Sequence, residues 1–171
     1  MRSEMKFCYE YPRPALTVDL TIFTLFEGDL KILLIERGAD PFLGYWALPG
    51  GFIDENETVV QAANRELFEE TNLKSIELKQ FYVASDPGRD PRGWTISIIF
   101  LGFIRNSRNN AFAGDDAKSL KWFSINDMPS LAFDHNIIIN NSKKLLLELS
   151  RFSIIGKDLL PDNFKLSEGY L

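Results

Sequence analysis

Three glutamates near the middle of the chain have the residue type and the spacing to hold a metal ion. Glu66, Glu69 and Glu70 stand at positions i, i+3 and i+4, so they share one face of a helix. Like charges at this spacing repel, and at the C-terminal end of a helix the dipole favours cations. A divalent cation bound by carboxylate oxygens reverses both penalties, and Arg65 can hold one carboxylate in place. The alternative is a solvated face of good helix formers.

A helix from about Thr58 to Thr71 is needed to bring these carboxylates together, and the apolar spacing predicts one. Asn56 is placed to cap its start, and Asn72 can end it in the left-handed conformation that glycine usually adopts there. The apolar residues expected to face a core are Val59, Val60, Ala63 and Leu67.

The wider stretch carries a resemblance. Its residues follow the pattern G-x5-E-x7-R-E-U-x-E-E-x-G-U from Gly51 to Leu73, where U is a bulky apolar residue. The stretch resembles the Nudix box, and only the last glycine is replaced, by Asn72, a residue that tolerates positive φ. The resemblance implies a hydrolase that cleaves the diphosphate of a nucleoside diphosphate linked to another moiety, with Mg²⁺ or Mn²⁺ as its cofactor.

By the same resemblance, four positions are expected to form the metal site. Glu66 and Glu70 would be the main metal carboxylates. Glu69 would be a further ligand or would hold a metal-bound water, and the backbone carbonyl of Gly50 would complete the site.

Two further catalytic candidates come from outside this ligand set. Arg65 is implied to form a supporting ion pair with Glu57 rather than to bind metal. Asp116, with Asp115 before it, is a candidate to position or deprotonate the attacking water. The alternative for the two aspartates is a turn that leads into a strand.

The resemblance extends to most of the chain. The segments YPRPALTVD, SDPGRDPRGWTIS and GDDAKSLKWF are similar to the ADP-ribose pyrophosphatase branch of the family. Arg89 and Arg92 are therefore expected to clamp phosphate or the terminal ribose with their planar guanidinium groups, and Arg37 is expected to bind substrate with them. The alternative is an exposed loop in which Asp86 and Asp90 neutralise Arg89 and Arg92.

The single histidine, His135, follows Asp134 near the expected start of the last helix. A structural role is one interpretation, and a place at the edge of a pocket is the other. Asp134 is expected to cap this helix, which runs to about Phe152.

Strand patterns alternate with the two helical ones. The pattern predicts strands at residues 16–26, 30–37, 75–85, 94–104 and 120–124, with Glu27-Gly28-Asp29 as the tight turn of a hairpin. This order predicts an α/β fold with a mixed sheet between helices, which agrees with the α/β/α sandwich that the resemblance implies.

A length of 171 residues with 45% hydrophobic content indicates one domain, here residues 1–152, and a tail, residues 153–171. A net charge of −5 argues against a broad nucleic-acid surface. One cysteine, Cys8, excludes an intramolecular disulfide. Without a signal peptide or an apolar run that spans a bilayer, a cytoplasmic protein with no membrane partner is expected.

The expected partner is a small nucleoside diphosphate substrate, with ADP-ribose cut to AMP and ribose 5-phosphate, in a homodimer. The tail is similar to the linker that leads to a winged-helix domain in ADP-ribose-sensing regulators of this family. A ligand-sensing domain without its DNA-binding part is therefore the alternative function, and a pyrophosphatase for another nucleotide is a second one.

Overall fold

The computed structural model describes residues 9–104 and 117–152. Its elements, in chain order, are β1 (Ala15–Phe26), β2 (Asp29–Arg37), β3 (Trp46–Ala47), β4 (Gly50–Phe52), α1 (Val59–Thr71), β5 (Leu78–Ala84), β6 (Thr95–Phe103), β7 (Ala117–Ser124) and α2 (His135–Phe152). The five predicted strands are all present, with ends that differ from the prediction by at most three residues. The short strands β3 and β4 had no strand pattern of their own.

One mixed sheet carries the fold. Its strand order is β3-β2-β1-β6-β5, with β4 paired to β1 and β7 paired to β2. The long inner strands β1 and β6 run parallel, and the other pairings are antiparallel. The β1–β2 hairpin turns at Glu27 and Gly28, which both have positive φ, as the turn chemistry predicts.

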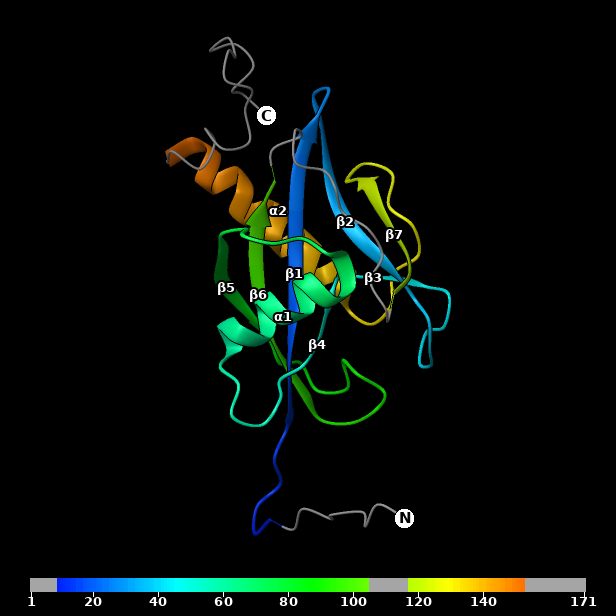
Figure 1. The fold of residues 1–171 in the computed structure, drawn as a ribbon, viewed down its shortest axis with the longest axis vertical. Coiled ribbons are helices and arrows are strands. Elements are labelled where there is room, and N and C mark those ends of the chain that lie inside the picture. The colour runs from blue at the N-terminus through cyan, green and yellow to red at the C-terminus, as the bar shows by residue number, and fades with distance from the viewer. Residues whose placement is uncertain (1–8, 105–116, 153–171) are drawn as a thin grey trace.

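The sheet lies between the two helices, with α1 over one face and α2 over the other (Figure 1). Successive side chains of a strand point to opposite faces, so β1 contributes to two cores. Val18, Leu20 and Ile22 pack with α1, whereas Phe23 packs on the α2 side. The same alternation places the buried polar residue Asp19 on the α2 side. This arrangement is the predicted α/β/α sandwich.

The start of α1 corrects a prediction. Thr58, not Asn56, is the N-cap: its side chain accepts the Gln61 N–H, and the Gln61 side chain accepts the Thr58 N–H in a capping box. Asn56 instead has a positive φ of 66° in the preceding loop. Asn72 ends the helix in the left-handed conformation, as predicted.

The expected core face of α1 is correct except at one position. Ala63 and Leu67 are buried and Val59 is partly buried, but Val60 is 52% exposed. On α2, Ile138 is buried and Leu145 and Leu149 are partly buried. In the part of the chain that the structure describes, neither helix has both the length and the apolar content that crossing a membrane requires.

Candidate active site

Two of the three glutamates are on the inner face of α1, against β4. Glu66 and Glu70 are 9% and 8% exposed, which is unusual for carboxylates on a helix. The Gly50 N–H donates to Oε2 of Glu70 at 2.8 Å. Glu69, the residue before Glu70, has a side chain that is half-exposed. The helical spacing therefore places the carboxylates of Glu66 and Glu70 against β4, whereas that of Glu69 stays near the solvent.

The glycines of β4 are required by this close packing. A Cβ on Gly51 would overlap the carboxylate of Glu66, and a Cβ on Gly50 would overlap the carbonyl oxygen of Val18. Gly50 also has a φ of +151°, which L side chains rarely adopt. Glycine at position 51 lets Glu66 reach the backbone of β4, and glycine at position 50 lets β4 lie close to β1.

Arg65 links the parts of this stretch. Its Nε and Nη2 donate to the two oxygens of Glu57, both at 2.8 Å. Its Nη1 donates to Glu66 at 2.7 Å and to Glu69 at 3.0 Å, and its Nη2 also reaches the carbonyl of Phe52 at 2.9 Å. The arginine thus holds two of the proposed metal carboxylates and forms the predicted ion pair with Glu57.

The electrostatics separate Glu57 from Glu66. Hydrogen bonds from Arg65, and then from the Asp54 amide, lower the pKa of Glu57 to about 2. Burial raises the pKa of Glu66 above its usual value, although Arg65 opposes that effect. Glu57 therefore stays a permanent anion for Arg65, whereas Glu66 is a desolvated carboxylate that a cation would stabilise.

The donor set fits a hard divalent cation. Glu66, Glu70 and the Gly50 carbonyl offer oxygen ligands, which Mg²⁺ and Mn²⁺ prefer. The carboxylate of Glu66 lies so close to Gly51 that it fills the space a side chain there would need, so it is packed against the strand. Within residues 9–104 and 117–152, no three acidic, histidine or cysteine side chains are grouped closely enough to hold a metal ion by themselves. The site would therefore rely on backbone, water and substrate oxygens for further ligands.

A buried polar cluster lies on the opposite face of the sheet, at the start of α2. Arg89 donates from Nε and Nη2 to the two oxygens of Asp134, at 2.9 and 2.8 Å, and its Nη2 lies 3.7 Å from Asp19. Ser97 donates to Asp19, and His135 Nε2 lies 3.6 Å from it. The carboxylate of Asp134 thus forms an ion pair with Arg89. The side chain of Arg89 is only 5% exposed.

A cavity of about 90 Å³ joins the two groups of residues. Glu70, Gly50 and Gly51 line one side of it, and Asp19 and His135 line another. Its lining therefore includes residues from both faces of the sheet.

Two arginines and two aromatic rings complete the cavity wall. The guanidinium carbon of Arg92 lies 4.9 Å from the ring centre of Phe52 and 5.2 Å from that of Phe133. Arg37 lies 4.8 Å from the ring centre of Phe133. Arg92 also forms an ion pair with Asp90 at 2.7 Å, but its side chain is 39% exposed. Arg92 and Arg37 thus place cationic groups in the wall of the cavity that Glu70 also lines.

The Nudix domain model matches residues 16–145 of this chain. The chain belongs to the Nudix family. ADP-ribose pyrophosphatase of Methanocaldococcus jannaschii is 46% identical over 131 residues, which cover 77% of this chain and 74% of that protein. The chain is therefore a member of the Nudix family that is similar to an ADP-ribose pyrophosphatase over most of its length.

A regulator is also similar. The "ADPR responsive transcriptional repressor NtrR" of Acinetobacter baylyi is 33% identical over 163 residues. That match covers 93% of this chain but only 65% of the repressor, so the chain spans slightly less than two thirds of the repressor's length. A cocrystal structure of the NUDIX domain of Shewanella oneidensis NrtR with ADP ribose has a TM-score of 0.74 and 33% identity, over 80% of this chain and 90% of that one.

The structure places most predicted site residues of this Nudix chain together. Gly50, Glu70, Arg37, Arg89 and Arg92 all line the cavity. Asp115 and Asp116 lie outside the described residues. Arg89 pairs with Asp134 rather than with the aspartates of its own loop, whereas Arg92 pairs with Asp90, as the alternative interpretation expected.

Among the cavity residues that had not been named from the sequence as site candidates are Asp19, Phe52 and Phe133. Asp19 interrupts a strand otherwise rich in apolar and β-branched residues, and that interruption was a usable signal. Phe52 directly follows the two glycines, and Phe133 precedes Asp134, but nothing in either context marked an aromatic ring as part of a site. Their placement depends on the pairing of β4 with β1 and on the loop before α2.

Proposed function

We propose that this Nudix chain hydrolyses ADP-ribose to AMP and ribose 5-phosphate with Mg²⁺ or Mn²⁺. One observation carries the proposal: Glu70 and the guanidinium groups of Arg37 and Arg92 line the same cavity. A diphosphate ester needs such a combination, because cations must neutralise its phosphate oxygens while a water attacks in line. The ADP-ribose named for the pyrophosphatase relative and bound in the similar NUDIX domain supports this choice of substrate.

Each residue has a distinct proposed task. Gly50, Glu66, Glu69 and Glu70 hold the metal, which when bound supplies charge neutralisation and an acidified water. Arg65 keeps Glu66 and Glu69 oriented through its two hydrogen bonds.

The substrate-facing residues are proposed separately. Arg92 and Arg37 contact the phosphates or the terminal ribose. Arg89 acts on the substrate only indirectly, because Asp134 already occupies its planar donor pair. Asp116 remains our proposed group for positioning the attacking water.

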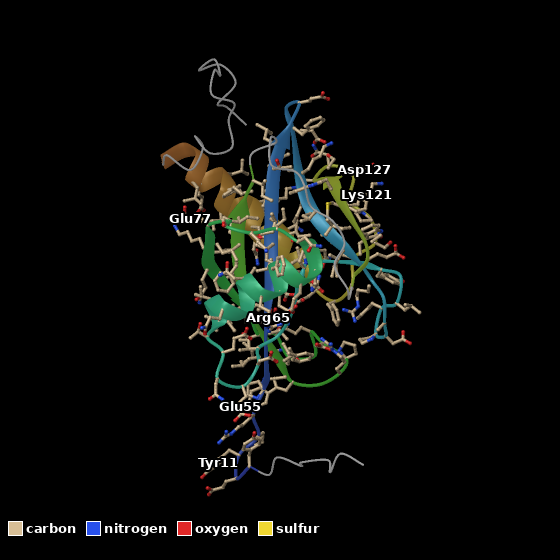
Figure 2. The ribbon with its side chains drawn as sticks, in the orientation of Figure 1. Tyr11, Glu55, Arg65, Glu77, Lys121 and Asp127 are labelled. Carbon is tan, nitrogen blue, oxygen red and sulfur yellow. The ribbon has the colours of Figure 1, made fainter. Side chains whose placement is uncertain are left out.

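The test is a hydrolysis screen over nucleoside diphosphate compounds with Mg²⁺, with products separated by chromatography. ADP-ribose is expected to give AMP and ribose 5-phosphate, and to be the best substrate. Glu70→Gln keeps the shape and removes a charged ligand, so activity is expected to fall about 100-fold or more. The control is Glu55→Gln, an exposed acid in the loop before α1 (Figure 2), which should keep full activity.

Two results would contradict the proposal. Near-normal activity of Glu70→Gln at saturating Mg²⁺ would remove the metal assignment. Faster cleavage of another nucleotide would favour a pyrophosphatase for that nucleotide.

A second candidate function is ligand sensing, because the similar repressor matches 93% of this chain and is described as ADPR responsive. In that case ADP-ribose would bind in the same cavity without being cut. Calorimetry with Mg²⁺ present separates the two functions: a sensor gives a stable binding isotherm, whereas an enzyme gives continuing heat and AMP.

We also propose that the chain works as a homodimer in the cytoplasm. Apolar side chains remain exposed around the N-terminal end of β1, including Tyr11, Leu16 and Trp94. An apolar patch of this kind is typical of an interaction surface.

A further inference from the structure

The backbone segment Leu48–Gly50 determines where the proposed metal ligand of β4, the Gly50 carbonyl, lies, and hydrogen bonds hold it at three points. The Gly50 N–H donates to Glu70, and the Pro49 carbonyl accepts from the Leu20 N–H at 2.8 Å. The third contact is different in kind, since it comes from the other side of the sheet. The Leu48 N–H donates to Nδ1 of His135 at 2.9 Å, with Leu48 only 2% exposed.

We propose that His135 is a positioning residue of the catalytic site, which as the neutral Nε2–H tautomer accepts the Leu48 amide and thereby sets Gly50 and Gly51 against Glu70 and Glu66. This inference rests on the proposed hydrolase function. In this role His135 does not need to contact the substrate.

The tautomer follows from the two sides of the ring. Nδ1 faces an N–H donor, so it must carry a lone pair and the proton must be on Nε2. Nε2 in turn lies 3.6 Å from Oδ1 of Asp19, a carboxylate that favours an N–H on that side. Burial, which lowers the pKa of His135, agrees with a neutral ring, although the carboxylates of Asp19 and Asp134 act in the opposite direction.

The carboxylate of Asp19, which faces the ring, is itself held in place. Asp19 is held by Ser97 and lies near Arg89, and Arg89 is held by Asp134, the residue before His135. Asp19 is also the register partner of Gly50 in the β1–β4 pair. The histidine therefore couples the start of α2 to the strand that carries the metal-site backbone.

Removing this acceptor should release the strand. The buried Leu48 N–H would be left without its acceptor. If the backbone around Leu48 moves so that this N–H reaches another acceptor, Gly50 moves with it. A misplacement of about 1 Å can cost about 100-fold in rate.

The experiment compares three substitutions of His135 with a control on α2. Asn places its oxygen near the position of Nδ1 and can still accept from Leu48. Gln places its polar end near Nε2 and cannot, and Ala has no acceptor. Asn140→Ala, an exposed change on the same helix, is the control.

The first measurement is NMR on the metal-free wild-type protein, where the single histidine gives an unambiguous ring signal. We expect the Nε2–H tautomer and a protected Leu48 amide. Exchange of that amide should speed up at least about 10-fold in His135→Ala and His135→Gln, but not in His135→Asn or Asn140→Ala. An Nδ1–H ring, or a Leu48 amide that exchanges equally in all variants, would overturn the inference.

The second measurement is the Mn²⁺ affinity by titration and, in parallel, kcat and KM with Mg²⁺. We expect His135→Ala and His135→Gln to bind Mn²⁺ more weakly and to lose about 10- to 100-fold in kcat with a smaller change in KM, and His135→Asn to recover most of both. Equal losses in Asn and Gln would overturn the positioning role. If His135→Ala does not fold, the Asn–Gln pair decides the result.

Failure of the proposed function is recognised separately. A wild-type protein that does not cut any nucleoside diphosphate contradicts the hydrolase proposal, while the amide exchange and Mn²⁺ titration still decide the role of His135.

Discussion

At the scale of single residues, Glu57 is the clearest case of a charge whose state is fixed by its partner. Its folded pKa of about 2 is lower than the ordinary value of 4.5, because Arg65 and the Asp54 amide donate to it. A depressed carboxyl pKa gives stability that is present above pH 4.5 and is lost as the pH falls towards 2.

We therefore expect Glu57→Gln to be less stable than the wild type at neutral pH. The difference in unfolding free energy, from urea titrations, should shrink between about pH 4.5 and pH 2. A difference that stays constant over this window would show that the Glu57 charge does not contribute through Arg65.

The two loop arginines should respond differently to truncation. Arg89→Ala leaves Asp134 and Asp19 without a buried cation, which typically costs about 3–5 kcal/mol of stability. Arg92→Ala should cost less stability, because its side chain is more exposed than that of Arg89. It should instead remove about 1.5–3 kcal/mol of transition-state binding for ADP-ribose.

Thermal unfolding and kcat/KM on ADP-ribose and on a second nucleoside diphosphate sugar check this contrast. Equal losses on both substrates would make Arg92 a generic phosphate contact. No loss on either would remove it from the site.

At the scale of elements, the sequence patterns predicted the features that depend on residues close together in the chain. The β1–β2 turn and the left-handed end of α1 at Asn72 follow from the conformational preferences of single residues. The core face of α1 was wrong only at Val60, which is 52% exposed whereas Val59, Ala63 and Leu67 pack in the core.

Elements that depend on distant contacts could not be predicted in the same way. β3 and β4 are two and three residues long and exist because they pair with β2 and β1. The bond from Leu48 to His135 joins residues 87 positions apart, and no spacing rule reaches that far. The carboxylates of the site were predictable from one helix, whereas the Asp19–Arg89–Asp134 cluster required the assembled sheet.

The N-cap of α1 offers a test at this scale. Thr58→Ala removes the side chain that accepts the Gln61 N–H and should cost about 1 kcal/mol in unfolding free energy. Asn56→Gly is the matched change at the position first expected to be the cap. Because Asn56 has positive φ and does not cap the helix, glycine should leave stability nearly unchanged. Denaturant unfolding of both variants decides between the two caps.

At the scale of the whole molecule, the proposed site lies where three separate segments meet: α1 with β4, the Arg89–Arg92 loop, and the start of α2. The cavity is lined by residues from each of them, including Glu70, Arg92 and His135. In the proposed site, the metal ligands come from the α1 side of the sheet and the positioning residue His135 comes from the α2 side. A rigid central sheet is suited to holding both sets in register.

The surface near the N-terminal end leads to the prediction of a dimer. Tyr11 lies on the segment that extends beyond the sheet (Figure 2) and is 71% exposed. Trp94 is 55% exposed, and its carbonyl accepts from the Ala15 N–H at 2.9 Å, so this residue borders the start of β1. Leu16 is exposed beside them. A second copy that covers these side chains would remove apolar area from water, which favours association.

Light scattering at micromolar concentration should therefore give twice the chain mass of 19.6 kDa. Replacing Tyr11 with Asp and Trp94 with Ser should shift the protein to the monomer, because a charge and a hydroxyl are costly to bury at such a contact. Val60→Ser is the control, since Val60 has an exposure similar to that of Trp94 but lies on α1 rather than at the start of β1. A monomeric wild type would contradict the dimer, and a double variant that remains dimeric would place the interface on another surface.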